Sequence, residues 1–286
     1  MKPILSAGLL YLCCATLYGQ DTPPAVPPAQ QQTPSPTVAP PEISRDDPDN
    51  GGSITGFYWS PQGTPKMLPG KKAANPAGQT IALPPDDKKS PGFIISIPAG
   101  KFNRVEASYW QAYGAGSPGN APVNLTPFGA TILQGDPLYN TYQIRNIKLV
   151  WNYLTYPAPP LDSKFRVKTF WGVQYTHINA VIDAPTEIGN TQLPAVGSRQ
   201  IIYPVLGIGA EYLATKHLYM DTRVSAFALP HRAAYWDASA NIVVHSRHIE
   251  LFGGYQIFYF KTTPSSDQYF TGTLRGPIAG ARWMFH

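Results

Sequence analysis

The sequence predicts an all-β fold, an eight-stranded antiparallel transmembrane β-barrel with a polar lumen that follows a disordered Pro-rich tail. Three observations predict this fold. Runs of alternating apolar and polar residues, separated by turn residues, fill the chain from residue 101 onward. Charged residues make up only 14% of the chain, against about 25% in typical soluble domains. Long and short connections alternate between the runs, as in barrels that cross a membrane.

The alternation predicts strands at about 102–113, 138–155, 164–183, 199–214, 217–229, 234–246, 248–262 and 268–285. In the segment 165–177, FRVKTFWGVQYTH, Val167, Trp171 and Val173 share one face, whereas Arg166 and Lys168 lie on the other. A register shift of one residue would exchange the two faces, so the register is strongly specified. The runs are rich in Tyr, Val, Ile, Thr and Phe, which favours strands over helices.

The polar faces of these strands carry six basic and five acidic side chains. The lumen of an eight-stranded barrel is just wide enough for side chains to fill it. The apolar faces carry almost no charge, as contact with lipid requires. We therefore predict that the polar faces point inward and form a lumen charge network of paired ions, made of Arg104, Glu106, Lys148, Arg166, Lys168, Glu211, Asp221, Arg223, Asp237, Glu250 and Arg282.

The first 100 residues of the chain form three segments with different compositions. Residues 1–19 have a Lys, an apolar stretch and a terminal Gly, and they predict a secretory signal peptide that removes both cysteines. Residues 20–50 are Pro-rich and predict a disordered linker, either a spacer toward the cell wall or an unstructured tail. Residues 51–100 contain recurrent Gly and Pro and predict an irregular periplasmic segment, so the predicted barrel domain covers residues 101–286.

The chain offers few groups for catalysis or metal binding. The histidines are not spaced as metal ligands, and the predicted mature chain has no cysteine, so we expect no metal and no cofactor. No cluster of Lys and Arg is interleaved with aromatic residues, which argues against nucleic-acid binding. His245 and Ser246 are adjacent and would point to opposite faces of a strand, whereas His177 has no Ser two residues on. We therefore assign no catalytic residues and predict that the protein is not an enzyme.

The last strand carries a motif that relates the chain to a known group of proteins. Gly280, Trp283 and Phe285 match the C-terminal assembly signal of bacterial outer-membrane barrels, whereas Ile278 departs from its polar position and His286 follows its final aromatic residue. With its predicted strands, the chain resembles small eight-stranded outer-membrane barrels such as the membrane domain of OmpA-type proteins. The resemblance implies a bacterial outer-membrane location with both barrel termini periplasmic. The implied partners are the barrel-assembly machinery, outer-membrane lipid and lipopolysaccharide.

Several functions are compatible with this architecture. The first hypothesis is a largely closed outer-membrane barrel with a structural or surface-interaction role. The second is a narrow passive channel for small polar solutes, or a sensor of small molecules. The third is a lipid A-modifying enzyme, because some barrels of the resembled group are such enzymes. A fourth, a secreted soluble barrel that binds an apolar ligand, requires the apolar faces to point inward.

Overall fold

The computed structural model describes residues 51–68, 80–83, 90–100, 102–156, 164–184, 194–229, 233–262 and 269–285. The predicted signal peptide and Pro-rich linker lie outside the described residues. Within these ranges, no helix has both the length and the apolar character needed to cross a membrane.

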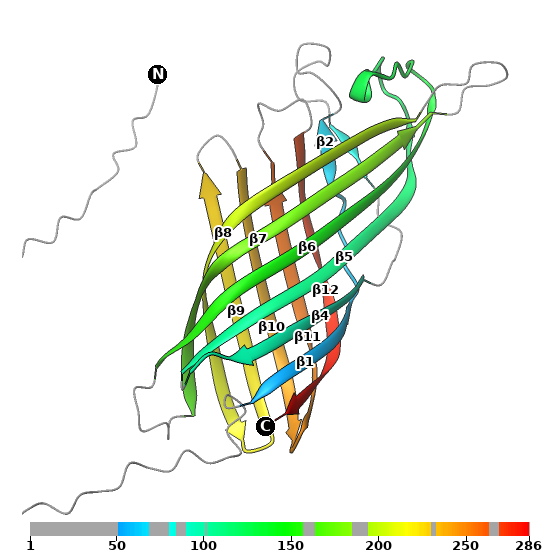
Figure 1. Cartoon of the computed structure of the whole chain (residues 1–286). Helices are drawn as coiled ribbons and strands as arrows, with labels where there is room; N and C mark the ends of the chain where they lie inside the picture. The colour runs from blue at the N-terminus through cyan, green and yellow to red at the C-terminus, as the bar shows by residue number, and fades with distance from the viewer. Residues whose placement is uncertain are drawn as a thin grey trace, which may run out of the picture. The chain divides into compact units, whose positions relative to one another are not determined.

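The described chain is built almost entirely of antiparallel strands (Figure 1). One short 3₁₀ helix, η1 (Pro127–Gly129), lies between two of them. The strands are β1 (Gly52–Trp59), β2 (Lys66–Leu68), β3 (Ile81–Ala82), β4 (Ser90–Pro98), β5 (Asn103–Asn120), β6 (Pro137–Tyr156), β7 (Phe165–Asp183), β8 (Ala195–Thr215), β9 (Leu218–Leu229), β10 (Ala233–Ser246), β11 (Ile249–Lys261) and β12 (Tyr269–Phe285).

Ten of these strands form a closed ring, which corrects the predicted number of eight. Each strand from β4 to β12 pairs with the next, and β1 pairs with both β4 and β12. Ile54 of β1, for example, lies opposite Ile95 of β4 and Trp283 of β12. The short strands β2 and β3 extend the sheet beside β12, beyond the end of β1. The ring therefore has no free sheet edge along β1 and β12 where they pair.

The two additional ring strands lie in the segment 51–100, which we expected to be irregular and periplasmic. That expectation is wrong for β1 and β4. Both strands are short, with eight and nine residues, and Gly or Pro occurs in each of them. Gly and Pro weaken the sequence signal of a strand. The eight strands predicted from residue 101 onward are present, although β5 and β8 are longer than predicted.

The two ends of the barrel differ in their connections. At one end, which we call the turn end, Lys216–His217 joins β8 to β9 and Arg247–His248 joins β10 to β11. Phe285, the last described residue, pairs with Gly52 at the same end. The much longer connection of residues 121–136 between β5 and β6 lies at the opposite end, which we call the loop end (Figure 1).

The outer wall of the barrel is apolar and the alternate positions face the lumen. On β8, Ile202 and Leu206 are 72% and 60% exposed, whereas Tyr203 and Val205 between them are 2% and 0% exposed. The same alternation places Trp171 of β7 and Ile242 of β10 on the outer wall. A contiguous apolar outer surface of this kind indicates an apolar environment around the barrel.

Glycine lets aromatic rings lie close to the wall inside the lumen. Gly207 of β8 is opposite Phe170 of β7, and a Cβ atom at Gly207 would overlap the Phe170 ring and lie 2.6 Å from the Val224 carbonyl oxygen. The absence of a side chain at residue 207 is therefore what allows the Phe170 ring to occupy this position.

Replacement of Gly207 by Val is expected to lower the free energy of unfolding by about 1–3 kcal/mol, because the added methyl groups displace a packed ring. Urea unfolding in detergent micelles, followed by Trp fluorescence, measures this change. Gly253→Ala is the matched control, since a Cβ atom at Gly253 would meet no atom within 4 Å. Equal unfolding midpoints for the two variants would contradict the expectation.

The connection between β5 and β6 folds back toward the barrel interior. Leu125 and Ile132 exchange two backbone hydrogen bonds of 2.8 Å, and both side chains are buried. The ring of Phe128 in η1 lies against Gly197 of β8. This connection therefore packs on the lumen-facing side of the long strands at the loop end.

Candidate functional site

The charged side chains of the lumen surround one cavity in the turn-end half of the barrel. This cavity, which we call the charged chamber, has a volume of about 180 Å³. Ten of the eleven side chains of the predicted lumen charge network line it, and the eleventh, Glu250, is fully buried beside Arg282. The ten lining side chains come from seven ring strands. Each of them reaches the chamber because it occupies an inward position of the alternating pattern.

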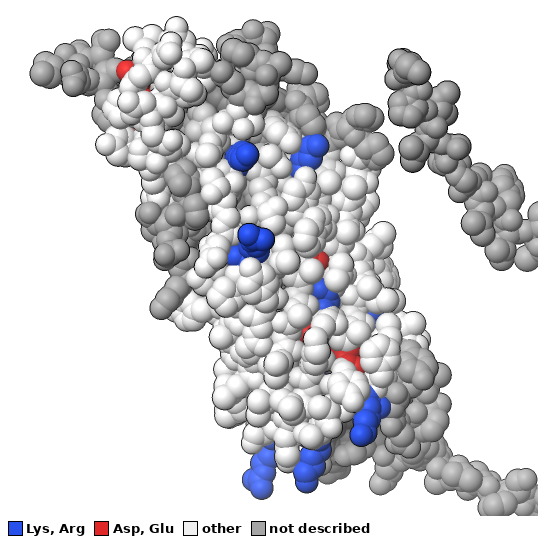
Figure 2. Space-filling view, turned by 180° about the vertical axis from the view of Figure 1, so that it is seen from behind, with Lys and Arg blue, Asp and Glu red and all other residues white. Residues whose placement is uncertain are grey.

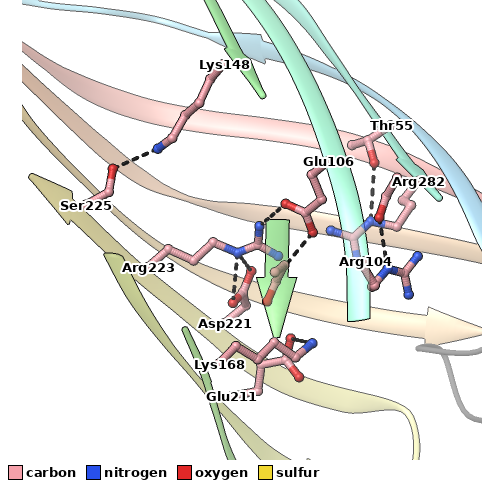
Figure 3. A network of polar contacts seen from close by, with 12 residues as sticks. Thr55, Arg104, Glu106, Lys148, Lys168, Glu211, Asp221, Arg223, Ser225 and Arg282 are labelled. Atoms are coloured by element: carbon pink, nitrogen blue, oxygen red, sulfur yellow. Dashed lines mark hydrogen bonds and ion pairs between the residues drawn. The ribbon is translucent and has the colours of Figure 1, made fainter. Parts of the chain in front are cut away.

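One ion pair crosses the chamber from β9 to β5. Arg223 Nη1 donates to Glu106 Oε2 at 2.6 Å, and Arg223 Nε donates to Asp221 Oδ2 at 3.1 Å (Figure 3). Asn152 of β6 also donates to Glu106, at 3.3 Å. Arg223 thus joins opposite walls of the barrel and neutralises two carboxylates at once.

A second ion pair crosses the chamber from β6 to β10. Lys148 Nζ donates to Asp237 Oδ2 at 2.7 Å and to Ser225 Oγ at 2.8 Å. Ser225 in turn hydrogen-bonds Asp237. Lys148 Nζ also lies 5.7 Å from the centroid of the Phe170 ring, within the range of a cation–π contact.

The other ion pairs join neighbouring strands or the closing seam. Lys168 of β7 donates to Glu211 of β8 at 2.6 Å. Arg282 of β12 donates to Glu250 Oε2 at 2.7 Å and to Thr55 Oγ1 of β1 at 3.2 Å. The Arg282 contacts therefore span the seam where the first and last ring strands meet.

Sequence reasoning missed several uncharged members of this network. Arg104 donates to Ser96 Oγ at 2.9 Å and to the carbonyl oxygen of Gly51 at 2.8 Å. His245 Nδ1 lies 3.3 Å from Glu250 Oε1. Ser96 and His245 lie on inward positions of their strands, but Ser96 was missed because β4 was not predicted as a strand. Arg166 lines the chamber near these groups.

These contacts place most lumen charges beside an opposite charge. A charged group that is removed from water without a partner costs several kcal/mol, so such pairing is required for a filled lumen. The chemistry of the chamber is therefore that of a paired and nearly neutral ion network, with polar groups of both signs facing a small cavity.

A layer of aromatic rings borders the charged chamber on its loop-end side. Trp110 of β5 lines the chamber and contacts Trp59 and Phe258, with ring centroids 5.0 Å apart in both cases. Phe258 stacks on Phe260, with centroids 5.8 Å apart. We call these four residues the aromatic layer. Each is at most 5% exposed, so their rings fill the lumen at this level.

Beyond the aromatic layer, buried aromatic and aliphatic side chains lie in the lumen together with buried polar ones such as Gln174 and Thr176. Tyr203 and Tyr235 lie with ring centroids 4.9 Å apart, and both are buried. Met67, Leu83 and Phe270 are also buried at this end. Hence the lumen has two zones, a turn-end zone with the ion pairs and a loop-end zone in which aromatic and aliphatic side chains predominate.

The outer wall holds one contact between catalytic residue types. His177 Nε2 of β7 lies 2.9 Å from Ser198 Oγ of β8, and Arg145 of β6 is the cross-strand partner of His177. Local sequence does not reveal Ser198 as a partner of His177, because the contact forms between strands. In the part of the chain that the structure describes, no three His, Cys, Asp or Glu side chains are grouped as a metal site.

The residues of the C-terminal motif lie on both faces of β12. Trp283 and Phe285 are on the outer wall, opposite Ile54 and Gly52 of β1. Gly280 faces the lumen close to the ring of Phe252. The motif thus belongs to the strand that closes the ring.

Comparison with solved structures identifies barrels of similar fold. The outer membrane protease OmpT of Escherichia coli aligns with a TM-score of 0.55 and 9% sequence identity, over 83% of this chain and 97% of OmpT. The translocator domain of the autotransporter NalP of Neisseria meningitidis aligns with a TM-score of 0.43 and 11% identity, over 82% of this chain and 89% of that domain. The attachment invasion locus protein Ail of Yersinia pestis aligns with a TM-score of 0.35 and 9% identity, over 82% of this chain and 99% of Ail.

No protein-family model matches the sequence, and no curated protein matches it. At 9% identity, the similarity to OmpT extends to the fold alone. The ring of ten strands also departs from the eight-stranded families that the sequence resembles.

Proposed function

We propose that this protein is an integral barrel of the bacterial outer membrane that is closed to solutes and serves a structural or surface-interaction role. The closed ring of paired strands supports its insertion in a membrane, because every backbone polar group of a spanning segment needs a hydrogen-bond partner within the protein. The apolar outer wall supports insertion as well. The similarity in fold to OmpT supports a barrel of this class.

The proposal that the lumen is closed rests on the aromatic layer. The rings of Trp59, Trp110, Phe258 and Phe260 occupy the lumen, and the cross-chamber ion pairs fill the space beside them. A solute that entered the charged chamber from the turn end would meet these rings. The alternative of a narrow passive channel requires the aromatic layer to move.

In the proposed orientation the turn end and both barrel termini are periplasmic, and the loop end faces outward. Short turns on the periplasmic side and longer loops outside are typical of outer-membrane barrels. Gly280, Trp283 and Phe285 would then be read by the barrel-assembly machinery. The long outer ends of β5 to β8 would provide a surface for contact with other molecules outside the cell.

The membrane proposal is tested by expression of the full chain in a Gram-negative host. The protein is expected in the outer-membrane fraction, with a gel mobility that changes on heating because the folded barrel resists detergent at room temperature. Recovery of a soluble periplasmic protein would contradict the proposal.

The closed state predicts a clear result in planar bilayers. The wild-type protein is expected to give no stable conductance steps, whereas Trp110→Ala combined with Phe258→Ala should give them, because both substitutions remove rings between the chamber and the loop end. Trp236→Ala combined with Tyr259→Ala, a stacked pair on the outer wall, is the matched control and should stay closed. Regular conductance steps from the wild type would favour the channel alternative.

A lipid-modifying enzyme is a further candidate, and the contact between His177 and Ser198 favours it. A serine beside a histidine can attack an ester carbonyl while its proton passes to the imidazole. The leaving alcohol takes that proton, and water then releases the fatty acid from the serine. If the protein is such an enzyme, its expression should reduce the number of acyl chains on lipid A. The Ser198→Ala variant should not cause this change. Mass spectra of lipid A that are the same with and without the protein would contradict it.

A further inference from the structure

Three basic side chains lie on adjacent strands of the outer wall near the loop end. They are Lys66 of β2, Lys261 of β11 and Arg275 of β12, and we call them the cationic triad. Thr271 of β12 is the cross-strand partner of both Lys66 and Lys261. Arg275 lies four residues from Thr271 along the same strand, toward the turn end.

The cationic triad faces away from the lumen. Met67, Phe260 and Leu274 directly adjoin its three members in sequence, and each of these neighbours is at most 1% exposed and faces inward. Because successive side chains of a strand point to opposite faces, the triad belongs to the outer wall. Figure 2 shows separate Lys and Arg side chains on the upper part of the face that it draws.

The described part of the chain places no carboxylate beside the cationic triad. Five of the described carboxylates face or adjoin the charged chamber, and the other two are Asp136, between β5 and β6, and Asp183, at the end of β7. Within the described ranges, no ion pair includes a member of the triad. Three cations on adjacent strands repel one another, so an external anion would stabilise this arrangement.

The triad lies at the border of the apolar outer wall. Thr273, the β12 residue between Thr271 and Arg275 on this face, pairs with Tyr259 of β11. Tyr259 stacks on Trp236 of β10, with ring centroids 6.3 Å apart. Trp and Tyr on the outer wall of a barrel mark the level of the lipid headgroups. The three cations are therefore placed where headgroup phosphates would lie.

We infer that the cationic triad binds the phosphate groups of an anionic glycolipid in the outer leaflet, with the acyl chains lying on the apolar wall below. The inference rests on the proposed insertion and orientation of the barrel. The Arg275 guanidinium can bind a phosphate with two parallel hydrogen bonds, whereas Lys66 and Lys261 supply point charges above it. The aromatic rings beside the triad favour a lipid over a soluble phosphate compound, because they provide contact for the apolar part of the same molecule.

The test uses the full-length mature protein in detergent and native mass spectrometry. The probes are bisphosphorylated lipid A, chemically dephosphorylated lipid A and inorganic phosphate as a competitor. The test variant carries Lys66→Gln, Lys261→Gln and Arg275→Gln. The matched control carries Lys164→Gln, Lys216→Gln and Arg247→Gln, which remove the same charge from exposed positions at the turn end.

The wild type and the turn-end control are expected to bind bisphosphorylated lipid A equally well. The triad variant should bind it about a hundredfold more weakly, since each cation near a lipid surface contributes about fivefold in affinity. Dephosphorylated lipid A should bind the wild type and the triad variant equally weakly, because it lacks the phosphates that the triad would contact. Inorganic phosphate at millimolar concentration should compete little, which distinguishes a lipid site from a site for free phosphate.

Equal binding by the triad variant and the control would overturn the inference, and so would equal binding of the two forms of lipid A to the wild type. Strong competition by inorganic phosphate would assign the site to a soluble anion instead. The heat-dependent gel mobility of each protein is measured in parallel. If the wild type shows no heat-dependent mobility, the proposed membrane barrel itself is refuted. If both proteins keep the heat-dependent mobility and the triad variant binds lipid A as well as the wild type does, only the inference about the triad is refuted.

Discussion

A chain that begins at residue 101 is expected to fail to fold into a closed barrel. Such a chain lacks β1 and β4, so β5 and β12 lose the partners that complete the ring. It also lacks Trp59, which is fully buried in the aromatic layer, and Thr55, which accepts a hydrogen bond from Arg282. Two long sheet edges would be exposed, and exposed edges favour aggregation.

Refolding from urea into detergent micelles, followed by gel mobility with and without heating, measures this effect. The control is a chain that begins at residue 51, which retains all ten ring strands and is expected to show the mobility shift on heating. A mobility shift for the chain 101–286 would mean that β5 and β12 can pair directly. That result would support the predicted barrel of eight strands.

Arg223→Ala is expected to lower the free energy of unfolding by about 3–5 kcal/mol, because it leaves Glu106 and Asp221 as buried carboxylates without their cation. Arg223 contacts these carboxylates at 2.6 Å and 3.1 Å, and both are at most 9% exposed. The effect is large because a buried carboxylate that loses its ion-pair partner keeps the cost of its removal from water without the contact that offset this cost. Urea unfolding in micelles provides the measurement.

Two further variants separate charge from packing at this position. Arg223→Lys keeps the positive charge and should recover part of the lost stability, whereas Arg223→Met, which keeps the length of the side chain, should recover little. Lys216→Ala removes an exposed cation at the turn end and should change the free energy of unfolding by less than about 0.5 kcal/mol. If Arg223→Ala and Lys216→Ala unfold at the same urea concentration, the cross-chamber ion pair does not stabilise the barrel.

The long strands could be predicted because their alternation covers more than ten residues. In β7, Trp171 and Val173 on one face and Arg166 and Lys168 on the other specify both the strand and its register. β1 and β4 were missed because they are short and contain Gly or Pro, so their signal resembles that of a loop. Their pairing is decided by β12 and β5, which are distant in sequence, and local patterns do not report distant partners.

The charged residues of the lumen could be predicted individually, but the pairs they form could not. The alternation places Glu106 and Arg223 on inward faces, whereas their contact depends on the diameter of the ring and the tilt of its strands. The two zones of the lumen were missed for a related reason. Inward positions at the loop end, such as Tyr203 and Tyr235, are aromatic, whereas the lumen was predicted from the charged residues of the polar faces. The contact between His177 and Ser198 also depends on cross-strand register.

The seam between β1 and β12 has a consequence for the order of assembly. Because Gly52 pairs with Phe285, the ring cannot close until the last strand of the chain has been delivered. Pairing between segments that are distant in sequence slows folding. The bond between Arg223 and Glu106 joins residues 117 positions apart, so it too must wait until opposite walls face each other. The lumen charges are thus expected to keep their water until the final step, in which seam closure and loss of that water occur together.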